Sequence, residues 1–177
     1  MLNDFTRLYK HQIDKNVAKG LLAYTYAAMG NPNAKLVAED ILNTSGYPLT
    51  TTGQLAFPGS GSGFNNVNTP SWMWGYDITT EMGHQLLNWW GQVDYYTYSY
   101  AWAGDRKSID NALYASIPAT DVRKSQFGTS GTTNLMPINK FFDPGRTAGG
   151  QQTITTDYIF MRIEEFYLLS AESAAKN

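Results

Sequence analysis

One long stretch of this 177-residue chain carries no charge and few residues that favour regular structure. No charged residue lies between Asp40 and Asp77, and 20 of the 28 residues from Asn43 to Pro70 are Gly, Ser, Thr, Asn or Pro. These residue types favour turns and local bonds between side chain and backbone. The stretch therefore predicts a long surface excursion, and such loops inside a compact domain are usually functional or mobile.

Ahead of this stretch, residues 14–45 have the pattern of two paired helices. The run Gly30-Asn31-Pro32-Asn33 in the middle supplies a helix stop, a restricted turn and a cap. On either side of it, apolar side chains recur at helical spacing and share one side of a helix. The two stripes are Val17, Leu21, Tyr24 and Ala28, and then Val37, Ile41 and Leu42. We expect two antiparallel amphipathic helices.

The C-terminal residues 157–177 predict a helix that follows Thr155-Thr156-Asp157. Its small or apolar face consists of Ile159, Ile163, Phe166, Ser170 and Ala174. A partner helix does not follow, so the chain is expected to be a piece that ends in mid-motif. Between the two helical ends, residues 108–127 predict a short helix and a turn through Pro118.

Composition excludes several function classes. The net charge is −2 and only 16% of the residues are charged, so a phosphate-backbone partner such as nucleic acid is not expected. Without cysteine there is no disulfide, thiolate zinc site or Cys nucleophile. The two histidines lie in no triad or zinc motif, so neither a metal site nor a cofactor is predicted. No secretion signal is visible, so either the chain is cytoplasmic or its targeting end is missing.

Four segments, in this order, resemble the SusD/RagB family of outer-membrane nutrient-binding lipoproteins. Residues 16–49 are similar to a family helix pair with its Ser-Gly-Tyr exit, and residues 71–79 read SWMWGYDIT. Residues 109–127, IDNALYASIPATDVRKSQF, contain an Asp-x-Arg motif, and residues 161–176 read MRIEEFYLLSAESAAK. The last segment matches the pattern Arg-x-x-Glu-x-x-Leu-x-x-Ala-Glu at Arg162, Glu165, Leu168, Ala171 and Glu172.

This resemblance implies a mainly α fold of tetratricopeptide-like helical pairs, of the α/α superhelix type, with long irregular loops and little β structure. It implies one partial domain over residues 1–177, a middle portion of a typical member: a helical hairpin at 14–45, a loop-rich middle at 46–156 and a terminal helix at 157–177. Family members are not enzymes. They are lipid-anchored at the outer membrane, on the cell-surface face, where they bind oligosaccharides and pass them to a SusC-like TonB-dependent transporter. The anchor has no counterpart in this chain.

The aromatic residues supply the candidate binding site. All five tryptophans lie between Trp72 and Trp102, and aromatic residues make up 14% of the chain. Sugars expose C–H faces, so their sites combine a rigid aromatic plane with amide or hydroxyl partners. The candidate planes for carbohydrate binding are Trp89, Trp90, Tyr95, Tyr96, Tyr98 and Trp102.

The same aromatic residues have a purely structural interpretation. Tyr96, Tyr98, Tyr100 and Trp102 alternate with small or polar residues, which predicts an extended strand with all four on one side. Such stripes are usually core, and both interpretations hold if alternate residues face solvent. Trp72 and Trp74 lie in a recurring structural stretch of the family and are expected in the core.

The charged residues of the motifs predict structural ion pairs. Arg162 and Glu165 are three apart on a helix and therefore neighbours, and Glu172 lies on the same side. Glu165 and Glu172 are about 10.5 Å apart along such a helix, too far for a catalytic pair. In the family, Asp121 and Arg123 help to fix a turn.

Two rival functions remain open at this stage. The scaffold could hold a protein partner with the aromatic segment as its interface, without a glycan site of its own. Alternatively, paired carboxylates such as Asp77 and Glu81 could hydrolyse glycosides.

Overall fold

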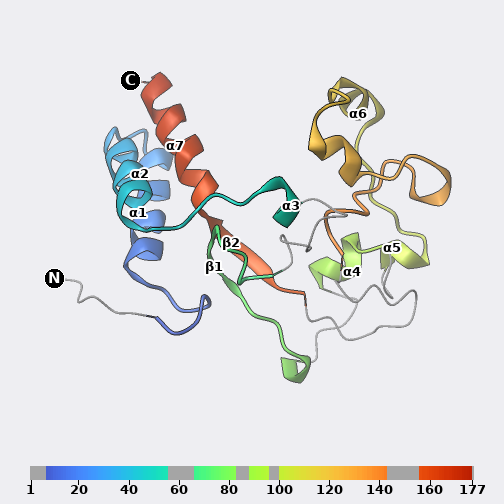
Figure 1. Cartoon of the computed structure of the whole chain (residues 1–177), viewed down its shortest axis with the longest axis horizontal. Helices are drawn as coiled ribbons and strands as arrows, with labels where there is room; N and C mark the ends of the chain where they lie inside the picture. Colours follow the sequence, from blue (N-terminus) through green and yellow to red (C-terminus); the bar gives the residue numbers. More distant parts are fainter. Residues whose placement is uncertain (1–6, 56–65, 83–87, 96–99, 143–155, 177) are drawn as a thin grey trace. The chain divides into compact units, whose positions relative to one another are not determined.

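The computed structural model describes residues 7–55, 66–82, 88–95, 100–142 and 156–176. Within these residues the chain is mainly helical with one two-stranded sheet (Figure 1). The elements in chain order are α1 (Lys15–Ala28), α2 (Asn33–Thr44), α3 (Thr52–Leu55), β1 (Trp72–Tyr76), the 3₁₀ helix η2 (Thr80–Met82), α4 (Trp89–Val93), α5 (Tyr100–Ala103), α6 (Asn111–Ser116), the 3₁₀ helices η3 (Val122–Gln126) and η4 (Gly131–Thr133), β2 (Tyr158–Arg162) and α7 (Ile163–Lys176).

The chain divides into two compact units. Unit 1 contains Met1–Thr50, Val67–Tyr76 and Ile159–Asn177, and unit 2 contains Thr51–Asn66 and Asp77–Tyr158. The expectation of one partial domain over residues 1–177 stays a prediction.

Unit 1 is built on three helices, and the expected hairpin is present as α1 and α2. The Asp14 side chain caps α1 by accepting a hydrogen bond of 2.9 Å from the Val17 amide. Gly30 has a φ of +65° at the turn, a conformation that glycine adopts without strain. Helix α2 packs against both α1 and α7, as Figure 1 also shows. The core of this unit consists of Val17, Ala23, Ala38, Ile41, Met73, Met161, Ile163 and Phe166.

The terminal helix is shorter than the sequence predicts. Tyr158–Arg162 form strand β2, which pairs with β1, and the helix starts only at Ile163. The prediction of helix from residue 157 is wrong here because pairing with a strand more than 80 residues earlier satisfies this backbone. Burial follows the strand period: Met161 is fully buried and Phe160 is exposed. The Ile163 amide then donates to the Ser71 carbonyl at 3.0 Å, which fixes the start of α7.

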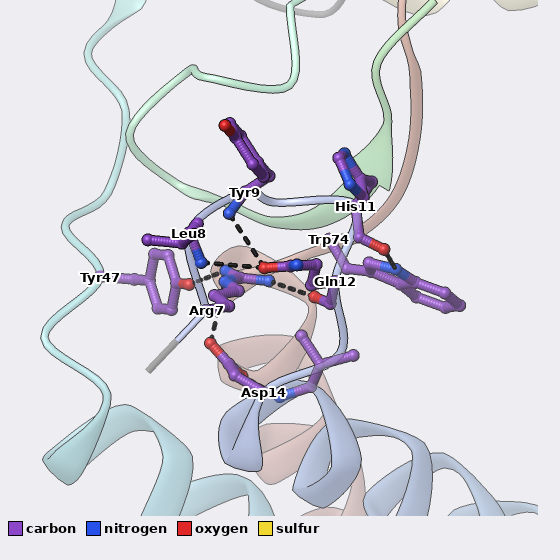
Figure 2. A network of polar contacts seen from close by, with 9 residues as sticks. Arg7, Leu8, Tyr9, His11, Gln12, Asp14, Tyr47 and Trp74 are labelled. Carbon is purple, nitrogen blue, oxygen red and sulfur yellow. Dashed lines mark hydrogen bonds and ion pairs between the residues drawn. The ribbon is translucent and has the colours of Figure 1, made fainter. Parts of the chain in front are cut away.

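A network of polar contacts fixes residues 7–13, which we call the strap, to unit 1 (Figure 2). The largely buried Arg7 guanidinium lies 3.0 Å from the Asp14 carboxylate and donates to the Gln12 carbonyl at 3.0 Å. It also donates to the Tyr47 hydroxyl. Since Asp14 caps α1 and Tyr47 follows α2, the arginine joins the strap to both helices of the hairpin.

Unit 2 consists of short helices and turns. Asp110 caps α6 by accepting from the Ala112 and Leu113 amides, which agrees with the short helix expected within residues 108–127. The predicted strand is wrong where it is described, because Tyr100–Ala103 form helix α5. Ala101 is fully buried while Trp102 is 43% exposed, so one turn of helix places the small residue inside. Residues 96–99 lie outside the described part of the chain.

Among the described residues, no helix combines the length and the apolar character that crossing a lipid bilayer requires.

Gly20 allows α1 to approach β2 and α7 closely. A Cβ atom at this position would lie 2.6 Å from the Met161 sulfur and 2.7 Å from the Phe166 ring. We therefore expect Gly20→Val to lower the free energy of unfolding by about 1–3 kcal/mol through overpacking. Urea denaturation measures the change. Gly53→Ala is the control, since a Cβ there meets no atom within 4 Å, and an equal loss in both variants would contradict the close approach.

Candidate functional site

The candidate site is built around helix α4 in unit 2. Asn88 starts this helix: its side-chain oxygen accepts from the Gly91 amide at 3.0 Å. Successive residues of a helix point about 100° apart, so the adjacent Trp89 and Trp90 face different surroundings. Trp90 is buried at 3% exposure, whereas Trp89 keeps 45% of its surface exposed. The helix thus presents one indole to solvent and anchors the other.

Four aromatic contacts hold the two tryptophans. The Trp89 ring lies 4.7 Å from Trp90 and 4.9 Å from Phe141, edge-on to both. Trp90 also meets Phe141 edge-on at 6.3 Å and stacks on Tyr158 at 6.4 Å. Edge-on contacts of this kind are favourable and directional. We call Trp89, Trp90, Phe141 and Tyr158 the Trp89 cluster.

Tyr158 ties the backbone of α4 to this cluster. Its hydroxyl accepts a hydrogen bond of 3.3 Å from the Trp89 amide. Burial raises the pKa of Tyr158 above its usual range, although the Trp89 amide partly opposes the rise. Tyr158 therefore stays neutral at physiological pH, and the exposed indole is oriented before any ligand arrives.

The other predicted aromatic residues lie outside the four-ring cluster or outside the described residues. Tyr95 is half-buried with its hydroxyl 3.5 Å from the Thr132 hydroxyl. Trp102 is exposed on α5, which packs against α4. Tyr96 and Tyr98 lie outside the described residues. The structure thus brings Trp89 and Trp90 into contact, while Tyr95 follows α4 and Trp102 lies on the helix that packs against α4.

Phe141 and Tyr158 are members of the cluster that sequence reasoning missed. Phe141 comes some 50 residues after Trp89, next to an uncharged stretch without periodicity, and Tyr158 was assigned to the terminal helix. The only signal for these two residues in the sequence is that both are aromatic, because neither spacing nor a motif links them to α4.

The predicted core tryptophans differ from each other. Trp72 is fully buried, and the Arg162 guanidinium lies 5.1 Å from its ring. Trp74 is half-buried: it packs against the core of unit 1 and meets Phe160 edge-on at 5.1 Å.

The carboxylate of Glu165 connects three elements. It accepts from the Arg162 amide at 3.1 Å and lies 3.5 Å from the Arg162 side chain, and both side chains are half-buried. The Tyr24 hydroxyl of α1 donates to its other oxygen. Glu172 forms an ion pair with Lys176 instead, one turn further along α7. Glu165 thus has a structural setting, joining α1 to the junction of β2 and α7.

Asp121 and Arg123 form a local pair at the start of η3. The Asp121 side chain caps this helix, accepting from the Arg123 amide at 2.9 Å and from its guanidinium at 3.0 Å. These bonds to Arg123 lower the pKa of Asp121 to about 2. A half-buried carboxylate held ionised in this way fixes a turn and cannot donate a proton near neutral pH.

The described residues do not support the hydrolase alternative. A general acid in a glycosidase needs a raised pKa. The Thr79 hydroxyl beside Glu81 lowers the pKa of this glutamate, and Glu81 is exposed. Within the described part of the chain, no group of three His, Asp or Glu side chains is placed to hold a metal ion.

Comparison with known proteins identifies the fold. Neither a family model nor a curated protein matches this sequence. Among solved structures, the chain is similar to a SusD-like carbohydrate binding protein from Bacteroides vulgatus ATCC 8482, with 23% sequence identity and a TM-score of 0.66. The similarity covers 98% of this chain and 36% of the other, so the chain spans about a third of that protein's length. The chain has a SusD-like fold, which confirms the resemblance and the mainly α fold predicted from the sequence.

The two adjacent tryptophans should differ in their effect on stability. Trp90→Ala removes a buried ring from the Trp89 cluster and should cost about 3–5 kcal/mol of unfolding free energy. Trp89→Ala removes a half-exposed ring and should cost about 1 kcal/mol or less. Urea denaturation followed by circular dichroism measures both, and equal losses would contradict the assignment of Trp89 as the exposed plane.

Tyr24 should make the protein sensitive to alkaline pH. Burial raises the pKa of Tyr24 well above its usual range, and the hydrogen bond to Glu165 raises it further. A tyrosine ionises near pH 10 in the unfolded chain, so the free energy of unfolding should fall as the pH rises above about 10. We expect Tyr24→Phe to be less stable than wild type by about 1 kcal/mol below pH 10, because it lacks the hydrogen bond. The difference should shrink between pH 10 and 12.

Urea midpoints measured from pH 8 to 12 provide this comparison. Tyr167→Phe is the control, because Tyr167 is exposed on α7. A difference between wild type and Tyr24→Phe that stays constant over the whole range would contradict the raised pKa.

Proposed function

We propose that the chain binds oligosaccharide or polysaccharide through the Trp89 cluster, with the exposed Trp89 indole as the stacking plane. The observation that carries this proposal is the combination of 45% exposure with edge-on contacts to Trp90 and Phe141. A rigid aromatic plane costs little entropy when a ligand binds. The carbohydrate-binding function of the structural neighbour supports the same chemistry.

The physical basis of binding is the match between an indole face and the C–H face of a sugar ring. Both surfaces are apolar and are poorly hydrated, so stacking them removes apolar area from water. Amide and hydroxyl groups around the plane would select the orientation of the sugar. Gln92 is half-buried on the same helix and is our candidate for this role, while exposed Trp102 on the adjacent α5 is a candidate second plane.

We further propose that the full-length protein acts at the bacterial surface. The SusD-like fold supports a role as a lipid-anchored outer-membrane lipoprotein that delivers glycans to a SusC-like TonB-dependent transporter. In this role the chain contributes binding and orientation, and no bond of the glycan is broken.

The second candidate function is a protein-interaction module without its own glycan site. It is favoured by exposed apolar side chains of unit 1, among them Met29 at the end of α1, Leu36 on α2 and Leu168 on α7. Exposed apolar side chains mark a protein interface where they form a contiguous patch. This function predicts capture of the transporter in a pull-down without any sugar, and it predicts no retention of the chain by polysaccharide gels.

Affinity electrophoresis in native gels containing polysaccharide tests the glycan proposal. We expect the wild-type chain to be retarded in a gel of its cognate glycan, and Trp89→Ala and Trp102→Ala to be retarded less. Loss of an aromatic contact of about 1 kcal/mol increases the dissociation constant roughly fivefold.

Tyr167→Ala is the matched control, because Tyr167 is equally exposed but lies on α7 of unit 1. Wild-type mobility of the Trp89→Ala variant in every gel that retards the wild type would remove Trp89 from the site.

A further inference from the structure

A row of four aromatic rings lies on unit 1, where the strap meets the two-stranded sheet. Tyr9, on the strap, is 60% exposed and stacks on His11 with ring centroids 5.3 Å apart and planes only 10° from parallel. The His11 carbonyl accepts from the Trp74 indole at 3.3 Å. Trp74 in turn meets Phe160, which is 50% exposed on β2, at 5.1 Å. These contacts join Tyr9, His11, Trp74 and Phe160 into the structure that we call the Tyr9 row.

The polar contacts of the strap hold this row in place. The Leu8 and Tyr9 amides both donate to the Gln12 side-chain oxygen, at 2.8 and 3.2 Å, and thereby close the turn that carries the Tyr9 ring. The Gly75 amide of β1 donates to the Lys10 carbonyl at 3.2 Å. Figure 2 shows the Tyr9 and His11 side chains pointing away from Arg7 and Asp14. The Tyr9 and His11 rings are therefore exposed on a fixed backbone.

The two cations of the strap are directed into the protein. Arg7 contacts Asp14, Gln12 and Tyr47, as described above, and Lys10 donates from its amine to the Thr69 carbonyl at 2.7 Å. The row itself contains no Asp, Glu, Lys or Arg. An anionic ligand such as nucleic acid or an acidic polysaccharide would need free cations, and the strap directs both of its cations to internal partners.

The size of the row also distinguishes between ligands. A stable protein interface takes about 20–30 residues from each partner, whereas the row offers four side chains. Flat rings with polar edges, here the Tyr9 hydroxyl and the His11 ring nitrogens, suit a ligand with apolar faces and a polar rim.

We propose that the Tyr9 row is a second saccharide site, one that binds neutral sugar rings by stacking. It rests on the proposed function in that the ligand is of the same class, but it uses residues of unit 1 that the Trp89 cluster does not contain. Two stacking sites in one chain would raise the avidity for a polysaccharide above that for a short oligosaccharide.

The test uses the full chain and two kinds of polysaccharide gel. The neutral panel consists of an α-glucan, a β-glucan, a xylan and a mannan, and polygalacturonate is the anionic probe. Tyr9→Ala and Phe160→Ala should each weaken retention by a neutral polysaccharide about fivefold, which corresponds to one aromatic contact. Leu8→Ala is the matched control, since Leu8 is the exposed aliphatic neighbour of Tyr9, and it should behave as wild type.

A second measurement separates the two sites. The ligand is the retained polysaccharide, cut to short oligosaccharides. Its addition should shift the indole N–H signal of Trp74 in NMR spectra of the ¹⁵N-labelled chain, and single Trp→Phe variants assign this signal.

A shift confined to Trp89, together with wild-type retention of Tyr9→Ala and Phe160→Ala, overturns the second site and leaves the proposed function intact. A loss in Tyr9→Ala with an unchanged Trp89→Ala supports the row and rejects the Trp89 cluster as the site. Preferential retention by polygalacturonate, or by no member of the panel, overturns the assignment to neutral sugars.

Discussion

The pairing of β1 with β2 is the constraint on which the rest of the structure depends. It brings Trp72–Tyr76 beside Tyr158–Arg162, and the segment between these strands contains most of unit 2. On the inner side of the pair, Met73 and Met161 enter the same core as the helical hairpin. A closure of this length is entropically costly, and burial of apolar side chains at the junction offsets that cost.

Two groups of aromatic side chains follow from this arrangement. In the Trp89 cluster a buried tryptophan supports an exposed one, and in the Tyr9 row the strap supports a tyrosine by means of backbone hydrogen bonds. Both devices fix an aromatic plane in advance, so little conformational entropy remains to be lost on binding. This common physical logic connects the proposed glycan function with the second site inferred on unit 1.

The helical hairpin, the cap at Asp110 and the contact between Arg162 and Glu165 follow from local patterns. Each depends on residues within about one turn of a helix or on a turn signal such as Gly30-Asn31-Pro32-Asn33. The predicted strand at Tyr100 and Trp102 was wrong: their alternation favours a strand, but tertiary packing overrode this local pattern and buried Ala101 in a short helix. Likewise, β2 could not be separated from α7 by periodicity, since its partner strand lies far away in the sequence.

The sequence by itself determined the place of the hairpin and the region that holds the tryptophans, because periodicity and turn residues act over a few positions. The mainly α fold was implied by the family resemblance of its motifs. Only the tertiary structure decided which ring of the Trp89–Trp90 pair is exposed and that Phe141 and Tyr158 contact this pair. It also decided that contacts through His11 and Trp74 connect Tyr9 with Phe160. These relations depend on contacts between residues that are about 50 to 90 positions apart, and such contacts arise from packing, which local patterns do not encode.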